Sequence, residues 1–358
     1  MAKEKSMVLV KPEKMELQEF EIPEIGPEEF LLKVEMVGIC GGDPIEYRGL
    51  NPKTEYPLIL GHEVAGVIDK IGENAKDKYG VEKGDKVSVE PYIICGECYY
   101  CLNSLYQFCE NSKIYGVNIS SKKPPHIWGA YGEYMYGAPG SKVHKIKDDV
   151  SPKAACMSSV IGNGVRWVKR LGEVQFNDSV VIIGPGAQGL ATTIAAKEAG
   201  ANPIIIMGKT RNPEKWDLAS EYGADYIIDT DKVDNPIEKL ENINNGNKAD
   251  VVIETTGAGP MMELGLDLVR PAGKLIVIGT NGFDKSKLTT DKIVFNEIEV
   301  KGGLGQSWDT ETAVDIINSQ KYAIEKMVTH VYPLEKAKEA IEFYMNNNGE
   351  AIRVAIKP

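Results

Sequence analysis

The chain has 358 residues, of which 42% are hydrophobic and 26% charged, and its formal net charge is -11. Single hydrophobic cores stop growing at roughly 250 to 300 residues, so this length predicts two domains. The negative charge opposes binding to nucleic acid and to anionic membranes. No apolar run approaches the roughly 18 residues of a membrane helix, and residues 1–20 lack the apolar core of a secretory signal. We therefore expect a cytoplasmic protein without a nucleic-acid or membrane partner.

The first part of the chain has the pattern of a mostly β domain. From Ser6 to about Asp148, short runs rich in valine and isoleucine alternate with Gly, Pro and Asp, as in residues 30–40, 63–72 and 84–93. Such runs are typical of strands joined by turns. We expect this domain to comprise residues 1–157 and to be rejoined by residues 304–358, which end in a strand-like segment.

Three potential metal ligands lie at the ends of these predicted strands. Cys40 ends one run, His62 directly precedes another, and Glu63 is the first residue of that second run. Catalytic zinc commonly takes three protein ligands and leaves a fourth position for water or substrate. Taken alone, Cys40 would more often be a buried apolar residue and His62 a core histidine.

A four-cysteine segment, about residues 95–109, follows. Its spacing is C-x-x-C-x-x-C-x7-C, formed by Cys95, Cys98, Cys101 and Cys109. Four thiolates in one short loop close a tetrahedral shell around zinc, which indicates a structural site. An iron–sulfur cluster is the competing assignment, but the usual proline after the last cysteine is missing.

From Ser151 onward the pattern changes to alternating strands and helices. Strand-like runs at residues 180–183, 203–208, 226–230, 249–257, 274–280 and 298–304 are separated by helical segments. This alternation predicts an α/β fold, a doubly wound parallel sheet, over residues 158–303. Two further amphipathic helices are expected at residues 309–319 and 335–347.

A glycine-rich loop follows the first of these strands. Gly184, Gly186 and Gly189 form G-x-G-x-x-G, with Ala187 and Gln188 between them, and the loop leads into a predicted helix. In a dinucleotide site these glycines allow the tight turn, the approach of the pyrophosphate and the packing of helix on strand. The alternative is a plain strand-to-helix turn, but the context favours a dinucleotide.

The residues at the end of the second strand indicate which dinucleotide the glycine-rich loop would bind. NAD sites usually carry an acidic residue there, about 20 residues after the loop, to bind the ribose hydroxyls. This chain has Gly208, followed by Lys209, Thr210 and Arg211. Glycine leaves room for a 2′-phosphate, and the basic residues supply charge. We therefore predict NADP rather than NAD, unless these charges are only solvated loop residues.

Nearly the whole chain resembles the zinc-containing medium-chain alcohol and polyol dehydrogenases. The resemblance rests on GIC followed by Asp43, on GHEVAGVI, on GDKV at residues 84–87, on the cysteine segment and on GPGAQG. It implies a GroES-like catalytic domain, a Rossmann coenzyme domain and a homodimer or homotetramer. It also implies that Cys40 and His62 bind catalytic zinc, with Glu63 as a ligand or a close neighbour.

Three positions depart from the pattern of that family. Gly42 stands where a Ser or Thr usually relays the proton of the alcohol, and Ile45 stands where many members have a histidine. Asp43 and a bound water remain as polar candidates for proton transfer. The third zinc ligand usually comes from the helix before the Rossmann domain, where this chain offers Cys156, or Ser158 and Ser159. Cys156 is equally well explained as a buried apolar residue.

The expected activity is therefore reversible, NADP-dependent oxidation of an alcohol or polyol to a carbonyl compound, with one structural and one catalytic zinc. Two alternatives stay open. One is a zinc-independent reductase of the same superfamily that acts on enones or quinones, and the other is a non-catalytic NADPH-binding protein.

Overall fold

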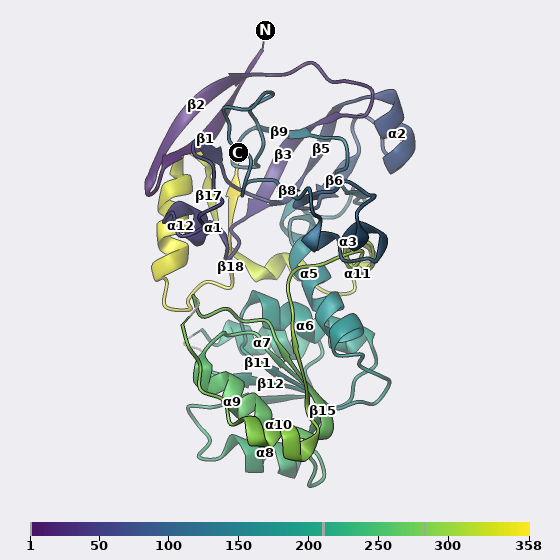
Figure 1. The fold of residues 1–358 in the computed structure, drawn as a ribbon, viewed down its shortest axis with the longest axis vertical. Coiled ribbons are helices and arrows are strands. Elements are labelled where there is room, and N and C mark those ends of the chain that lie inside the picture. Colours follow the sequence, from purple (N-terminus) through teal and green to yellow (C-terminus); the bar gives the residue numbers. More distant parts are fainter. Residues whose placement is uncertain (1, 210–211, 283) are drawn as a thin grey trace. The chain divides into compact units, whose positions relative to one another are not determined.

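The computed structural model describes residues 2–209, 212–282 and 284–358. The chain forms two compact units, which Figure 1 draws. The first unit holds Met1–Ser159 and Thr310–Pro358, and the second holds Val160–Asp309. Within the described ranges, no helix is both long and apolar enough to cross a membrane.

The first unit is built on β-sheets, as the sequence predicts. Its largest sheet has the strand order β10 (Val143–Lys145), β6 (Lys86–Val89), β5 (Glu63–Ile71), β3 (Phe30–Gly38), β18 (Arg353–Lys357) and β17 (Val328–Pro333), and β9 (Tyr134–Gly137) also pairs with β3. A second sheet has the order β2 (Lys14–Glu21), β1 (Lys3–Lys11) and β4 (Leu58–Ile59), and a two-stranded ladder joins β7 (Tyr92–Ile93) to β8 (Lys113–Ile114). Phe30, Leu31 and Leu32 of β3 are fully buried in the core of this unit.

Short helices connect these strands. They are α1 (Asp43–Tyr47), α2 (Glu73–Tyr79), α3 (Tyr99–Leu102), α4 (Pro152–Ala155), α11 (Thr310–Ser319) and α12 (Ala337–Asn346), with 3-10 turns at Tyr106–Phe108, Ile324–Met327 and Leu334–Lys336. The helical segment expected around Cys156 is divided. Cys156 lies at the C-terminal end of α4, and α5 (Ser158–Val165) then continues into π-helical turns at Arg166–Leu171.

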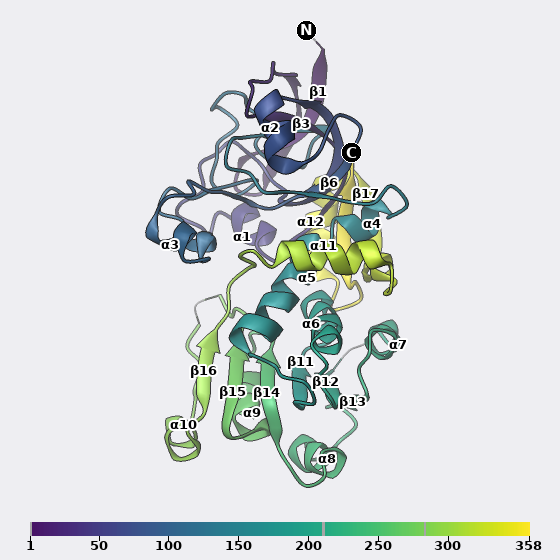
Figure 2. The same cartoon turned by 90° about the vertical axis from the view of Figure 1, so that its right-hand side faces the viewer.

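The second unit is a parallel sheet with helical crossovers, which confirms the predicted α/β fold. Its strand order is β13 (Tyr226–Asp229), β12 (Ile204–Gly208), β11 (Val180–Ile183), β14 (Ala249–Glu254), β15 (Val269–Val277) and β16 (Glu299–Gly302), and Figure 2 shows the strands side by side in this order. The crossovers contain α6 (Ala187–Glu198), α7 (Glu214–Glu221), α8 (Pro236–Ile243), α9 (Gly259–Leu268) and α10 (Thr290–Asn296). This strand order is that of the Rossmann dinucleotide fold, with β11 and β14 at the switch point.

Burial explains the continuous apolar runs of these strands. The side chains of Val180–Ile183 and Ile204–Met207 are all fully buried. Alternate residues of a strand pack against opposite faces of the sheet. Val181 and Ile183 of β11 join a core that also contains Leu240 of α8 and Leu266 of α9. The helix α6 contacts β11 and β12 and also packs on α7. A strand covered on both faces needs apolar residues at every position, which removes the polar alternation.

Candidate functional site

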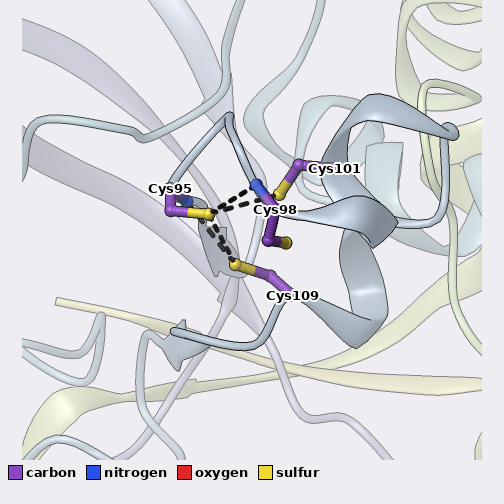
Figure 3. Close-up of side chains that lie close together, drawn as sticks. All are labelled: Cys95, Cys98, Cys101 and Cys109. Carbon is purple, nitrogen blue, oxygen red and sulfur yellow. Dashed lines mark hydrogen bonds between the residues drawn. The ribbon is translucent and has the colours of Figure 1, made fainter.

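The four cysteines of the 95–109 segment lie together in the first unit. Their sulfur atoms are all within 4.8 Å of one another, with 3.6 Å between the sulfurs of Cys95 and Cys109 and 3.9 Å between those of Cys95 and Cys101. Figure 3 shows the four side chains gathered between the turn at Cys95, the helix α3 and the loop at Cys109. All four thiols are free, and this arrangement fits a tetrahedral metal site without an open position.

Electrostatic conditions at these thiols favour a bound cation. Backbone N–H groups, that of Glu97 first, lower the pKa of Cys95 to about 6, and those of Glu110 and Cys101 lower the pKa of Cys98. Burial raises the pKa of Cys101 to about 12 and also raises that of Cys109. Cys95 and Cys98 therefore lose their protons more readily than Cys101 and Cys109, whose ionisation a nearby cation would favour.

A second group of potential metal ligands forms where β3 and β5 meet. Cys40 follows the end of β3, and His62 and Glu63 lie at the start of β5; one ligand atom from each lies within 4.8 Å of the others. The antiparallel register places Gly38 opposite Glu63, so the end of one strand and the start of the next are adjacent. Cys40 and His62 are partly buried, and Glu63 is buried.

Arg353 is a functional candidate that the sequence analysis missed. Its guanidinium is buried in β18 and forms an ion pair with the Glu63 carboxylate; the side chains are 3% and 1% exposed. Strand β3 runs between them, since Gly38 pairs with Glu63 on one side and with Ala355 on the other. A Cβ at Gly38 would lie 2.6 Å from Glu63 Oε2 and 3.5 Å from Arg353 Nε, so a glycine is needed to leave room for this ion pair.

Asp43 positions the residues around this group. Its Oδ2 accepts hydrogen bonds from the backbone N–H of Cys40 (2.8 Å) and from the hydroxyl of Tyr131 (3.1 Å), and its Oδ1 lies 3.7 Å from His62 Nδ1. Burial raises the pKa of the Cys40 thiol and of the Asp43 carboxyl and lowers that of the His62 imidazole. Among the described residues, Asp43 Oδ1 and His62 Nδ1 find no hydrogen-bond partner, and buried polar atoms of this kind fit a site that binds a cation.

Cys156, one of the alternatives for a further ligand, does not join this group. Cys156 is fully buried, its Sγ donates to the carbonyl oxygen of Lys153 (3.3 Å), and burial raises its pKa to about 12. The described metal-ligand groups contain Cys40, His62 and Glu63 without Cys156. Ser158 and Ser159 are buried at the start of α5. Cys156 therefore behaves as a buried thiol.

The glycine loop of the second unit has the geometry that a dinucleotide requires. Gly184 follows β11 with φ +111° and Gly186 precedes α6. A Cβ at Gly189 would overlap the carbonyl oxygen of Gly184, whereas a Cβ at Gly186 would meet no described atom within 4 Å. Ala187 is buried, and Gln188 Oε1 is a buried acceptor that no described donor reaches. Gly189 thus serves packing, and Gly186 leaves open space at the helix N-terminus, where phosphate binds in such folds.

The predicted ribose-binding turn is described only in part. Gly208 ends β12 with φ +148°, a conformation that favours glycine. Lys209 follows, and its Nζ lies 4.0 Å from Asp231 Oδ1, with both side chains largely exposed. Thr210 and Arg211 lie outside the described residues.

Comparison with known proteins shows which protein families and solved structures this chain is similar to. Residues 26–148 match the family "Alcohol dehydrogenase GroES-like domain" and residues 187–319 match "Zinc-binding dehydrogenase". A probable alcohol dehydrogenase of Mycobacterium tuberculosis is 33% identical over 94% of this chain and 93% of its own length, and the L-threonine 3-dehydrogenase of Pyrococcus abyssi is 34% identical over 91% of each. The crystal structure of an alcohol dehydrogenase from Thermotoga maritima is similar over the full length of both chains, with a TM-score of 0.91 and 28% identity.

Proposed function

The chain belongs to the zinc-binding, GroES-like alcohol dehydrogenase family, and on this basis we propose that it transfers hydride reversibly between NADP(H) and an alcohol or polyol or its carbonyl product. Residues 158–303 would bind the coenzyme, and residues 1–157 with 304–358 would bind the substrate. The observation that carries the proposal is the grouping of Cys40, His62 and Glu63, with unpartnered atoms of Asp43 and His62 beside it.

The two ligand groups fit zinc by their donor types. Cys95, Cys98, Cys101 and Cys109 would hold a structural ion, and Cys40, His62 and Glu63 would hold a catalytic one. A zinc ion at the second group would supply a Lewis acid for the substrate oxygen. Asp43 fixes the position of the Cys40 backbone and faces the imidazole of His62. Arg353 holds the Glu63 carboxylate in a buried position.

The preference for NADP is supported by the turn after β12. Gly208 lacks the carboxylate that would repel a 2′-phosphate, and Lys209 and Arg211 supply positive charge. Lys209 pairs at long range with the exposed Asp231, and exposed pairs of this kind contribute little energy. A 2′-phosphate would therefore compete easily for the Lys209 ammonium.

The test combines a metal count on purified protein with steady-state kinetics for NADP and NAD over alcohols and polyols. We expect about two zinc ions per chain and a higher kcat/KM with NADP. Cys40→Ala should lose one zinc and at least about 100-fold in kcat, since Lewis-acid catalysis supplies several kcal/mol.

Cys156→Ala is the matched control, because it also removes a free cysteine of the first unit but lies outside both ligand groups. It should keep both zinc ions and the activity. Full turnover by Cys40→Ala would refute the proposed role of the second group.

A zinc-independent reductase of the same superfamily is the second candidate. The observation in its favour is Gly42, which offers no hydroxyl for the proton of an alcohol. One zinc per chain, together with reduction of an enone or quinone and no oxidation of alcohols, would favour this candidate.

A further inference from the structure

Alcohol oxidation leaves a proton that this site must pass to solvent. The C–H bond breaks with its electron pair, which goes to the nicotinamide as hydride, and the O–H bond releases a proton. The proton needs an acceptor near the substrate oxygen. Gly42 has no side chain for this purpose, and Ile45 is apolar and 40% exposed.

Glu46 is a buried carboxylate that the functions described so far do not use. It lies three residues after Asp43 in α1 (Asp43–Tyr47), and its exposed fraction is 5%. Side chains three positions apart on a helix are neighbours, with Cβ atoms about 5 to 6 Å apart. The carboxyl groups of Glu46 and Asp43 therefore lie on adjacent positions of one helical face, and the Asp43 carboxylate faces His62.

Polar side chains from the following loop hold the Glu46 carboxylate. Asn51 Nδ2 donates to Oε1 at 2.9 Å, and the hydroxyl of Thr54 donates to Oε2. The hydroxyl of Tyr56 donates to the backbone carbonyl of Glu46 at 2.7 Å. Thr54 is only half-buried, and its neighbours Lys53 and Glu55 are exposed. A hydroxyl both donates and accepts, so Thr54 can connect the buried carboxylate to solvent.

The surrounding charges favour proton uptake by Glu46. Burial raises its pKa, and the negative charge of Asp43 raises it further, while the hydrogen bonds from Thr54 and Asn51 and the charge of His62 lower it. The net effect is a pKa above the usual value for glutamate. Of the groups packed around it, Asp43 and His62 interact with its charge, and the Tyr56 phenol does so from the loop.

We propose that Glu46 receives the hydroxyl proton of the alcohol and passes it to solvent through Thr54. This route would replace the usual relay, whose two positions are occupied here by Gly42 and Ile45. The proton binds a carboxylate oxygen of Glu46. Thr54 Oγ1 then takes this proton as its own hydroxyl hydrogen leaves to water, and the carboxylate is restored. This inference rests on the proposed oxidation of alcohols by a nicotinamide coenzyme.

The test uses the full-length zinc-loaded protein and the variants Glu46→Gln, Thr54→Val and Thr54→Ser. Glu46→Gln should lower kcat by about 100-fold, the usual contribution of a general base, with little change in KM. The loss should shrink as the pH rises, because hydroxide then accepts the proton. Thr54→Val should also lower kcat, and Thr54→Ser, which keeps the hydroxyl, should restore it.

A second measurement is independent of turnover. A pH titration of the carboxyl bands by infrared spectroscopy, with NADP bound and no alcohol present, should show a group that titrates above the usual range of glutamate and is lost in Glu46→Gln. The matched control is Glu342→Gln, since Glu342 accepts the hydroxyl of Tyr47 from the same helix at 3.0 Å but is 44% exposed. It should leave both the band and kcat unchanged.

Two outcomes would overturn the proposal. One is an unchanged kcat and pH profile in Glu46→Gln, with a wild-type protein that oxidises alcohols. The other is an infrared titration that is the same in Glu46→Gln as in the wild type, since the signal of Glu4, whose pKa burial also raises, is common to both proteins. A wild-type protein that oxidises no alcohol or polyol would instead refute the proposed function, and the infrared titration would still decide whether Glu46 takes up the proton.

Discussion

The buried ion pair between Arg353 and Glu63 allows a quantitative test of how the site is held together. Both side chains are almost fully buried, at 3% and 1% exposure. Removing one partner of a buried pair leaves the other charge uncompensated, at a cost of about 3 to 5 kcal/mol. We expect Arg353→Met to destabilise the metal-free first unit by this amount. In zinc-loaded protein the loss should be smaller, because a cation beside Glu63 compensates its charge.

The assay is urea-dependent hydrogen–deuterium exchange, measured with and without zinc and followed at β3, β5 and β18 for Arg353→Met and at β15 for the control variant. It reports the stability of the two units separately. Arg270→Met is the matched control, since Arg270 pairs with Asp250 at 2.7 Å but the side chains are 43% and 26% exposed; its cost should be about 0 to 1 kcal/mol. Equal costs for the two variants, or a cost of Arg353→Met that zinc does not change, would contradict this reasoning.

Two further predictions concern stability and coenzyme binding. Burial raises the pKa of Glu4 from 4.5 to about 7, so its proton is retained in the folded state and stability falls as the pH rises from about 4.5 to about 7. This loss is up to about 3 kcal/mol. Glu4→Gln should unfold at a higher temperature than wild type at pH 8 and at the same temperature below pH 4.5. A difference in unfolding temperature between the two proteins that stays constant from pH 4.5 to pH 8 would exclude the titration of Glu4 as the cause. Gly189→Ala should destabilise the second unit, because the added Cβ would overlap the carbonyl oxygen of Gly184. Gly186→Ala should fold normally and weaken the binding of NADP measured by calorimetry. Similar melting temperatures for the two variants would show that Gly189 is not needed for packing.

The sequence is most informative where the governing interactions are local. The alternation after Ser151 predicts the parallel sheet because strands buried on both faces must be apolar throughout, as Val180–Ile183 are. The cysteine segment predicts its own geometry for a similar reason. Its ligands lie within 15 residues, and the helix α3 and the turns around it bring the sulfurs together without help from distant strands.

The sequence is less informative where a turn interrupts a regular pattern. The apolar residues around Cys156 fit a continuous helix, but α4 ends at Ala155 and α5 begins at Ser158. Cys156 lies at this break, and its Sγ donates to the carbonyl oxygen of Lys153. Helix boundaries depend on tertiary packing as well as on local propensity, so the status of Cys156 could not be decided from the sequence.

Arg353 illustrates the remaining limit, because its role depends on strand register. A charged residue between Ile352 and Val354 in a buried terminal strand is the signal that could have marked it. Its partner, however, is 290 positions away, and a slip of one residue in β5 or in β18 would turn one of the two side chains to the opposite face. The pairing of Gly38 with both Glu63 and Ala355 fixes that register. Gly38, at the end of β3, therefore leaves the space in which the Glu63 carboxylate reaches Arg353 across that strand. The site depends on the pairing of three strands and not on the GHE motif alone.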